Sequence, residues 1–447
     1  MVAVTFYGGV AEIGGNKILL EDDDSRILLD FGMNFVERSK FYSEPWLSPR
    51  DERGLLEFGL LPKVPGLYKF DEKEPEIDAV FLSHSHTDHT AYISFLNRKI
   101  PVYCGETTAL ILRAFSEISP KSFDNDIEGL QFRTFRTGDK VKVGSIEVEP
   151  IHVDHSVPGC YGFIIHTSEG TVIYSGDLRM HGTKPEMTQD FVEASAATRP
   201  IAMLCEGTNL IGADYSTEQE VDVKIGKVVS NSQNLVLATF RNTDIDRTRT
   251  IFDVARRNHR KLAISLRQAY VLNKLKTDKN LEFPPIDSAD FLIFKREKKT
   301  YYKWEQTILG LSNVVDAQEV KKIQNRVILT TGFADLKELL DMRPEAGSNF
   351  ILSSSEPFNE EMELEYDKFV NWLDHFGLPM FHIHCSGHIQ PTEIKQVITR
   401  IHPKTLFPIH TEHPELYSRY ISDITRVKIP QKAVTYPLQS NGEWRQN

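Results

Sequence analysis

The sequence predicts an α/β protein with layered sheets, and three observations carry this prediction. The first 180 residues contain short apolar or alternating segments between Gly, Asp and Asn, a pattern typical of strands. From about Pro200, apolar runs alternate with helix-like segments, which indicates parallel βα units. After about Met380, histidines again occur close to apolar segments, as they do in the first part. An inserted α/β domain that interrupts a site-bearing domain explains this order better than three independent domains.

The individual elements follow from these patterns. Strands of the first part are expected in "VAVTFYGG", "NKILLEDDDSRILLDFG", "DKVKVGSIEVEPIHV" and "GFIIHTSEGTVIYSGD". Helices are expected around residues 90–97 and 107–117. Strands of the inserted part are expected in "PIAMLCEGTN", "NLVLATF", "RKLAISL", "RVILTTG" and "SNFILSSS". The predicted boundaries are therefore 1–195 for the first part, 196–378 for the insertion and 379–447 for the return.

Composition limits the classes of protein that the chain can belong to. The 447 residues are 40% hydrophobic, which is ample for sizeable cores, and no run approaches the ~18 apolar residues of a membrane span. The start "MVAVTFYGGVAEIGG" lacks a basic lead and an apolar signal core, so we expect a cytoplasmic protein without a membrane partner. The four cysteines lie far apart without a C-x-x-C pair, which predicts buried structural thiols.

Charge is distributed unevenly along the chain. The formal net charge is −11, yet residues 241–303 hold sixteen Lys and Arg against eight Asp and Glu. A basic segment on an acidic chain is either a phosphate-binding face or the solvated side of surface helices. Charge alone does not separate these two interpretations.

The stretch "DAVFLSHSHTDHTAYISFL" places His84, His86, Asp88 and His89 directly after an apolar run. Residues two apart in an extended chain point the same way, so His84 and His86 can share one metal ion. Imidazole nitrogen with carboxylate oxygen is the ligand set expected of Zn²⁺, with Mn²⁺ or Fe²⁺ as alternatives. The alternative is a helix N-terminus capped by Thr87 or Asp88, but a cap needs one such residue and not four.

Other apolar strands also end in candidate ligands. "PIHVDHSVPGCYGF" offers His152 and His155, and either could serve. "TVIYSGDLRMHG" offers Asp177, whose carboxylate can bridge two ions, and "PKTLFPIHTEHPE" offers His410. Their joint presence predicts a dinuclear site.

These motifs resemble the metallo-β-lactamase superfamily. H-x-H-x-D-H followed by His, Asp and a late His is its ligand order, and "HCSGH" with "PIHTE" is similar to its β-CASP branch, in particular to the shorter archaeal type of ribonuclease J. "YGGVAEIGGNK", "LLDFGM", "HSVPG", "SGDLR" and "CEGTN" also occur in the expected order. The resemblance implies an αββα sandwich with an inserted β-CASP domain, whose parallel sheet is flanked by helices. Two departures are "DHTAY", where many members have D-H-x-Gly, and the end of the sequence at "NGEWRQN", from which we expect a chain without the C-terminal domain of the bacterial enzymes.

The resemblance also implies roles for particular residues. His84, His86 and His155 would hold one ion, Asp88, His89 and His410 the other, and Asp177 would bridge them. Asp30 of "LLDFG" would support the ligand loop. Glu206 of "CEGTN" matches the acidic residue that the family places in its inserted domain. His388 would serve the leaving 3′-oxygen, and Asp88 would share in catalysis.

Candidate contacts to RNA lie later in the chain. Ser386 and Gly387 could present a hydroxyl and backbone N–H groups to phosphate, with His384 beside them. "LSSSEPFNE" offers Ser355 as a wall of a pocket for the 5′-terminal phosphate. Arg241, Arg247 and Arg249 follow a strand and open a helix, where they could bind phosphates or form an ordinary helix surface.

The favoured hypothesis is a 5′→3′ exoribonuclease with two divalent ions, Zn²⁺ before Mn²⁺, that hydrolyses single-stranded RNA, prefers 5′-monophosphate ends and can also cleave internally. RNA decay and maturation are the expected roles, with an RNA helicase, other decay factors and a second copy of the chain as candidate partners. The alternatives are a β-CASP endonuclease for RNA 3′ processing or DNA, and a small-molecule hydrolase such as a lactonase.

Overall fold

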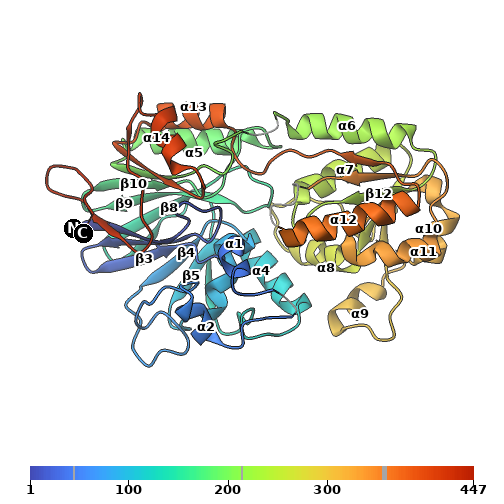
Figure 1. The fold of residues 1–447 in the computed structure, drawn as a ribbon, viewed down its shortest axis with the longest axis horizontal. Coiled ribbons are helices and arrows are strands. Elements are labelled where there is room, and N and C mark those ends of the chain that lie inside the picture. Colours follow the sequence, from blue (N-terminus) through green and yellow to red (C-terminus); the bar gives the residue numbers. More distant parts are fainter. Residues whose placement is uncertain (44–45, 213–214, 355–359, 447) are drawn as a thin grey trace. The chain divides into compact units, whose positions relative to one another are not determined.

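The computed structural model describes residues 1–447 except 44–45, 213–214, 355–359 and 447, and it describes only the backbone of residues 360–365. Two compact units make up the chain (Figure 1). Unit 1 comprises residues 1–213 and 387–447, and unit 2 comprises residues 214–386. Unit 1 is therefore built from both ends of the chain, with unit 2 inserted between them.

Unit 1 contains two seven-stranded sheets. The first has the order β21-β1-β2-β3-β4-β5-β6 and the second has the order β20-β19-β11-β10-β9-β8-β7. The strands of the first sheet are β1 (Val2–Gly8), β2 (Lys17–Asp22), β3 (Ser25–Leu29), β4 (Ala79–Leu82), β5 (Pro101–Gly105), β6 (Gln131–Phe135) and β21 (Thr435–Pro437). The strands of the second are β7 (Val141–Val143), β8 (Ile146–His152), β9 (Tyr161–Thr167), β10 (Gly170–Tyr174), β11 (Ala202–Glu206), β19 (Thr405–Ile409) and β20 (Arg426–Val427).

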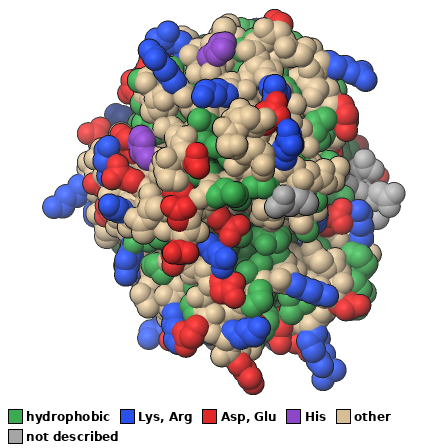
Figure 2. Space-filling model, turned by 90° about the vertical axis from the view of Figure 1, so that its left-hand side faces the viewer, with side chains coloured by type: hydrophobic (Ala, Val, Ile, Leu, Met, Phe, Trp, Pro, Cys, Tyr) green, Lys and Arg blue, Asp and Glu red, His purple; other side chains and the backbone are tan. Residues whose placement is uncertain are grey.

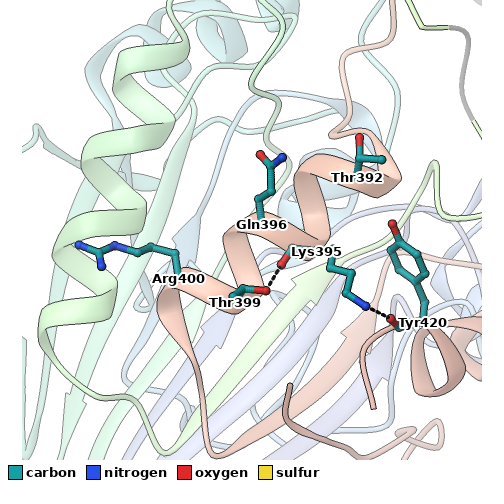
Figure 3. Close-up of a pocket in the computed structure, with 6 residues that line it drawn as sticks. All are labelled: Thr392, Lys395, Gln396, Thr399, Arg400 and Tyr420. Carbon is teal, nitrogen blue, oxygen red and sulfur yellow. Dashed lines mark hydrogen bonds between the residues drawn. The ribbon is translucent and has the colours of Figure 1, made fainter. Parts of the chain in front are cut away.

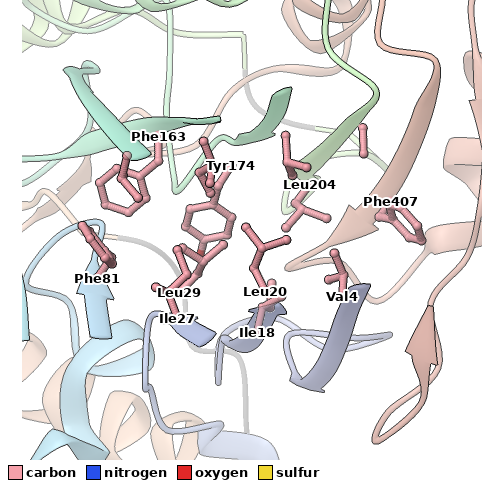
Figure 4. Close-up of a cluster of buried hydrophobic side chains, with 14 of the residues drawn as sticks. Val4, Ile18, Leu20, Ile27, Leu29, Phe81, Phe163, Tyr174, Leu204 and Phe407 are labelled. Carbon is pink, nitrogen blue, oxygen red and sulfur yellow. The ribbon is translucent and has the colours of Figure 1, made fainter. Parts of the chain in front are cut away.

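The two sheets of unit 1 pack face to face. Ile18, Leu20 and Phe81 of the first sheet meet Phe163 and Leu204 of the second in one buried cluster (Figure 4). Successive strand residues point to opposite faces, so the neighbouring residues Leu19 and Val80 belong to a separate cluster on the outer face of the first sheet. Both faces of this sheet are thus buried, which accounts for its nearly continuous apolar runs.

Helices cover the outer faces of the sandwich. In Figure 1, α5, α13 and α14 lie on one side of the sheets and α1, α2 and α4 on the other. This is the predicted αββα arrangement. The helices of unit 1 are α1 (Phe35–Ser39), α2 (Glu52–Glu57), α3 (Thr87–Thr90), α4 (Glu106–Ile118), α5 (Pro185–Ala197), α13 (Pro391–Ile401) and α14 (Pro414–Tyr420), with a 3₁₀ turn η1 (Ala91–Phe95). The helix predicted for 107–117 is confirmed, whereas the one predicted for 90–97 is a single α turn followed by this 3₁₀ turn.

Unit 2 contains one seven-stranded sheet of order β15-β14-β13-β16-β12-β17-β18, and all its strands are parallel. Its strands are β12 (Val236–Thr239), β13 (Lys261–Ser265), β14 (Phe291–Phe294), β15 (Val314–Val315), β16 (Val327–Thr330), β17 (Asn349–Leu352) and β18 (Met380–His382). Its helices are α6 (Glu218–Asn231), α7 (Ile245–Arg257), α8 (Leu266–Leu275), α9 (Lys303–Leu309), α10 (Ala317–Lys322), α11 (Leu339–Met342) and α12 (Glu360–His375), with 3₁₀ turns η2 (Gln324–Arg326) and η3 (Phe333–Glu338). Alternation of strands and helices produces this parallel sheet, as the sequence predicts.

Two strands do not lie where the predicted boundaries put them. β11, which the 196–378 boundary assigns to the insertion, pairs in parallel with β10 and β19 of unit 1. β18, which the 379–447 boundary assigns to the returning part, pairs with β17 of unit 2. β11 is a buried apolar strand, which has the same composition in either sheet, whereas β18 is a short edge strand with two exposed residues. The sheet that each strand joins depends on long-range pairing that local sequence does not encode. That unit 2 is a β-CASP domain stays a prediction.

The surface and the thiols fit the composition. On the face drawn in Figure 2, acidic and basic side chains are interspersed, with hydrophobic side chains scattered between them. The four cysteines are free and buried, as predicted. In the part of the chain that the structure describes, every helix is too short or too polar to cross a membrane.

Lys17 in β2 is a buried cation beneath the glycine turn that precedes it. Its ammonium group donates to the carbonyl oxygens of Gly15 at 2.9 Å and Gly32 at 2.8 Å. Burial lowers the pKa of Lys17 to about 7 from an ordinary value of 10.5. Between these two values the unfolded chain binds more protons than the folded chain, so the free energy of unfolding must rise with pH in that range.

We therefore predict that Lys17→Met removes this pH dependence. The difference in unfolding free energy between wild type and variant should grow by about 2–3 kcal/mol from pH 7 to pH 9, since one pH unit corresponds to about 1.4 kcal/mol. Urea unfolding at both pH values measures it. Lys99→Met, which removes an exposed lysine, is the control. Parallel pH profiles for wild type and the Lys17 variant would contradict the prediction.

Candidate metal centre

The polar site of unit 1 forms where parallel strands end side by side. β10, β11 and β19 are parallel neighbours, so Asp177, Glu206 and His410 come together at their carboxyl ends. In the other sheet, β3 and β4 are parallel neighbours, and they end at Asp30 and at the loop that begins with Ser83. The histidine-rich loop therefore projects from the end of β4 toward the ends of the second sheet.

One ligand cluster consists of His84, His86, His155 and Asp177, whose candidate ligand atoms all lie within 4.8 Å of one another. Nε2 of His84 lies 3.0 Å from Nδ1 of His86, and Nε2 of His155 lies 3.1 Å from the same atom. Oδ2 of Asp177 is 3.6 Å from Nε2 of His84 and 3.9 Å from Nε2 of His155. Tetrahedral ligands about 2.0–2.1 Å from Zn²⁺ lie about 3.3 Å apart, so this spacing suits one ion.

A second cluster consists of Asp88, His89, Asp177 and His410, again within 4.8 Å. Oδ2 of Asp177 is 3.1 Å from Nε2 of His89 and 3.8 Å from Nε2 of His410. Oδ2 of Asp88 is 3.2 Å from Nε2 of His410 and 3.9 Å from Nε2 of His89. Both clusters share Asp177, so the structure brings together all seven residues that the sequence nominated as ligands.

Unsatisfied buried atoms test whether the clusters suit metal ions. Both carboxylate oxygens of Asp177 and Nε2 of His89 are buried without a hydrogen-bond partner among the described residues. A buried carboxylate in this state is costly unless a cation compensates it. Divalent ions in the two clusters would supply that compensation, so the residues present fit a dinuclear metal centre.

Hydrogen bonds to the outer ring nitrogens orient four of the five clustered histidines. Nδ1 of His89 donates to Oδ2 of Asp30 at 2.7 Å, and Nδ1 of His155 donates to the carbonyl oxygen of Gly387 at 2.5 Å. Nδ1 of His84 is 3.0 Å from Oγ of Ser83. Nδ1 of His410 is likewise 2.8 Å from Oγ1 of Thr208. Because Nδ1 is used on the outside, each of these rings presents Nε2 to the cluster, which is how metal-ligating histidines are usually held.

Electrostatics within the cluster favour ligand protonation states for several groups. Burial, aided by neighbouring imidazoles, holds the pKa values of His84 and His155 well below the ordinary range, so both rings are neutral. Burial alone would raise the pKa of Asp177, but the surrounding histidines His410 and His89 outweigh it and hold it well below the ordinary range. Neutral imidazole and ionised carboxylate are the forms that coordinate metal.

Asp30 supports the histidine-rich loop by hydrogen bonds to Ser83 and His89. Its carboxylate accepts from the backbone N–H of Ser83 at 2.7 Å, from Oγ of Ser83 at 2.8 Å and from the Tyr174 hydroxyl at 2.6 Å, in addition to His89. Asp30 and His410 both adopt left-handed backbone conformations, with φ of 56° and 50°. Such φ values are uncommon for residues other than glycine and cluster at functional sites, where surrounding contacts hold them.

His388 lies next to the second cluster. Its Nδ1 is 3.2 Å from Oε1 of Glu206, 3.1 Å from Oγ1 of Thr208 and 3.7 Å from Oδ2 of Asp177. Burial lowers the pKa of His388, but the carboxylates of Glu206 and Asp177 outweigh burial and raise it to about 9. Asn209 donates from its side chain to the His388 carbonyl oxygen at 2.8 Å, which fixes the backbone there. Glu206 is part of unit 1 and not of the insertion that the resemblance implied.

Sequence reasoning did not single out Thr208 and Asn209. They lie two and three residues after Glu206, at which β11 ends. Polar residues after an apolar strand could have pointed to them. Of the two alternatives His152 and His155, the first cluster contains His155, whereas His152 lies 3.1 Å from Thr137 and packs on Tyr161, outside both clusters.

The residues nominated for RNA contact lie mainly in unit 2. Arg241 is exposed after β12, and His384 and Ser386 are half-buried after β18. Gly387 is close-packed, since a Cβ there would lie 2.7 Å from Oγ of Ser156. Ser355 lies outside the described residues.

Arg247 is not a surface residue, and the expectation that it contacts RNA is wrong. Its side chain is fully buried and pairs with Glu218 at 2.9 Å. Arg249 donates to the carbonyl oxygen of Glu282 at the other side of α7. The sequence left phosphate binding and an ordinary helix surface open, and the burial of Arg247 is neither of these. Burial depends on helix α6, which packs beside α7.

A separate pocket of about 620 Å³ lies along α13 (Figure 3). Its basic side chains are already paired, since Lys395 contacts Asp423 at 3.2 Å and Arg400 contacts Glu193. The pocket contains none of the clustered ligands, so we do not associate it with the metal centre.

Comparisons with known proteins agree with this geometry. Residues 58–204 match the family model described as "Beta-lactamase superfamily domain", a range that contains six of the seven clustered ligands. The chain is 24% identical to ribonuclease J of Mycoplasma genitalium, over 98% of this chain and 72% of that protein. It is also 24% identical to ribonuclease J2 of Bacillus subtilis (92% and 69%) and to ribonuclease J of Thermus thermophilus (92% and 68%).

The fold also matches a solved structure. A protein of unknown function from Enterococcus faecalis superimposes with a TM-score of 0.77 at 22% identity, covering 97% of this chain and 99% of that one. The region matched by the family model, residues 58–204, contains six of the seven residues of the two ligand clusters. The chain therefore contains a region that matches the beta-lactamase superfamily domain, and along nearly its whole length it is similar to proteins named ribonuclease J.

Proposed function

We propose that the protein is a metal-dependent ribonuclease of the ribonuclease J type that degrades single-stranded RNA from its 5′ end. The observation that carries the proposal is the pair of four-residue ligand clusters that share Asp177. The similarity to proteins named ribonuclease J supports RNA as the substrate. Roles in RNA decay and maturation follow from that substrate.

The donor set favours two zinc ions. His84, His86 and His155 would hold one ion, Asp88, His89 and His410 the other, and Asp177 would contact both. Nitrogen-rich donors suit Zn²⁺, with Mn²⁺ as the alternative. When bound, such a pair of ions activates water at neutral pH and offsets negative charge on phosphoryl oxygens.

We assign His388 to the leaving group. Its Nδ1 faces Glu206, so Nε2 is the ring nitrogen that would donate a proton to the leaving 3′-oxygen. Thr208 and Asn209 hold the ring and its backbone in this orientation. We also assign Asp88 a part in catalysis besides its proposed ligand role; its carboxylate lies in the second cluster with Asp177.

RNA contacts are assigned to unit 2 and the start of the returning chain. We assign phosphate binding to Arg241, which is exposed, and to His384, Ser386 and Gly387, which precede His388 in the chain. Unit 2 would be the inserted β-CASP domain. An RNA helicase, other decay factors and a second copy of the chain are the proposed partners.

The metal ligands can be tested by substitution. His84→Ala should abolish hydrolysis of RNA and lower the metal content, while RNA binding persists, because the RNA contacts proposed for unit 2 remain. Elemental analysis and an assay on labelled RNA measure both effects. His166→Ala, which removes an imidazole outside both clusters, should leave activity and metal unchanged. Full turnover by the His84 variant would remove the metal-based proposal.

A second substitution separates catalysis from metal binding. His388→Ala should retain the metal content of wild type yet lose about 10²–10⁴-fold in kcat, the range typical of general acid–base groups. Single-turnover kinetics with saturating enzyme measure the loss. Loss of metal together with activity would reassign His388 to the ligands.

The direction of degradation can be read from end-labelled RNA. A 5′-monophosphate RNA should release labelled mononucleotide first, and 5′-triphosphate or 5′-hydroxyl RNA should react more slowly because the terminal phosphate is bound. If internal fragments appear first from all three RNAs at equal rates, the enzyme is an endonuclease of the same branch.

A further inference from the structure

Arg247 in the first turn of α7 is the most deeply buried arginine of unit 2, with a side chain that is 0% exposed. Burying a guanidinium is costly unless every donor is paired. Glu218 at the start of α6 is also buried and accepts from Nη2 at 2.9 and 3.0 Å and from Nε at 3.3 Å. This forked pair uses Nε and Nη2, which carry three of the five N–H donors of the guanidinium group.

The other donors reach the carboxyl edge of the sheet. Nη1 of Arg247 donates to Oγ of Ser353 and, at 3.3 Å, to the carbonyl oxygen of Ser353, which directly follows β17. Nη2 lies 3.8 Å from Sγ of Cys385. Arg247 therefore connects the start of α6 with the chain after β17 and the chain after β18.

Ser353 links Arg247 to the segment that follows β18. Its hydroxyl accepts from Arg247 and donates to the carbonyl oxygen of Ile383 at 2.6 Å. Its backbone N–H donates to the carbonyl oxygen of Thr239 at the end of β12. The backbone N–H of Ile383 donates to Leu352 in turn. The ends of three adjacent parallel strands are thus tied together at one point.

The segment that begins at Ile383 continues directly into Ser386, Gly387 and His388. In open α/β sheets, ligands bind outside the carboxyl ends of the strands. Replacing a buried ion pair by apolar residues is often neutral for stability, so stability alone does not account for Arg247 and Glu218. Their contacts to the chain after β17 and β18 suit a role in placing the loop that begins at Ile383.

We propose that Arg247, held by Glu218, is a positioning residue that fixes the 383–386 segment for the RNA phosphate. It touches neither substrate nor metal and acts through Ser353 and the Ile383 carbonyl. The proposal rests on the proposed ribonuclease function for its kinetic consequence, but its structural consequence can be measured without RNA.

Two variants and one matched control test it. Arg247→Lys keeps the charge beside Glu218 but cannot also reach Ser353, because an ammonium lacks the fork of a guanidinium. The double variant Arg247→Met/Glu218→Leu removes both charges. The control is Arg260→Met: Arg260 is also buried and donates to the carbonyl oxygens of Ser232 and Asn234, which precede β12 at the opposite edge of the sheet.

Hydrogen exchange followed by mass spectrometry is the first readout. Both Arg247 variants should exchange faster than wild type in peptides that cover residues 381–388, whereas Arg260→Met should not change exchange there. Unchanged exchange in both Arg247 variants overturns the proposal, and so does global unfolding of both, which would make the pair purely structural.

Steady-state kinetics on 5′-monophosphate RNA is the second readout. Both Arg247 variants should lose about tenfold or more in kcat, since small misplacements of reacting groups have effects of this size, with KM within about threefold and metal content unchanged. Arg260→Met should lower the melting temperature and leave kcat unchanged. Equal kcat in all variants overturns the positioning role. An inactive wild-type protein overturns the proposed function, and the role of Arg247 is then decided by hydrogen exchange alone.

Discussion

The carboxylate of Asp177 is the group around which the interior of unit 1 is arranged. It is buried at the end of β10, and five imidazole rings lie with a nitrogen 3.1–3.9 Å from its Oδ2 atom. These rings come from the loop after β4, the loop after β8, the segment before α13 and the end of β19. An anion in this position requires compensation, because desolvation of a lone carboxylate is unfavourable. The convergence of four separate chain segments is therefore tied to one charge.

Four of these five histidines present Nε2 to Asp177 because their Nδ1 atoms already have hydrogen-bond partners, whereas His388 approaches with Nδ1. Partners of three kinds hold Nδ1: a carboxylate, a backbone carbonyl oxygen and hydroxyl groups, contributed by Asp30, Gly387, Ser83 and Thr208. Each partner follows a strand or lies in a tight loop, so the sheets determine the direction of these four rings. The left-handed backbone conformations of Asp30 and His410 contribute to this arrangement, because each turns the chain at a residue whose side chain takes part in the site.

Unit 2 uses a comparable principle with different chemistry. Its parallel sheet ends in backbone carbonyl groups and hydroxyls that need donors, and a buried arginine serves each edge. Arg260 satisfies carbonyl groups at the amino edge, and Arg247 satisfies groups at the carboxyl edge. Only the carboxyl edge continues into the segment that leads to His388. The proposed positioning role therefore belongs to Arg247 and not to Arg260.

The sequence by itself determined the donor chemistry of the site and the class of the fold. H-x-H-x-D-H after an apolar strand, with Asp177 and His410 at other strand ends, was sufficient to nominate six of the seven clustered residues, because local spacing and strand ends set where a side chain can point. The local pattern left His152 and His155 open, and the structure puts His155 in the cluster. Only the tertiary structure decided that β11 joins unit 1, that β18 joins unit 2 and that Arg247 faces inward. Burial and sheet membership depend on contacts between residues far apart in the chain, and an apolar strand or an arginine after a strand has the same local pattern in either setting.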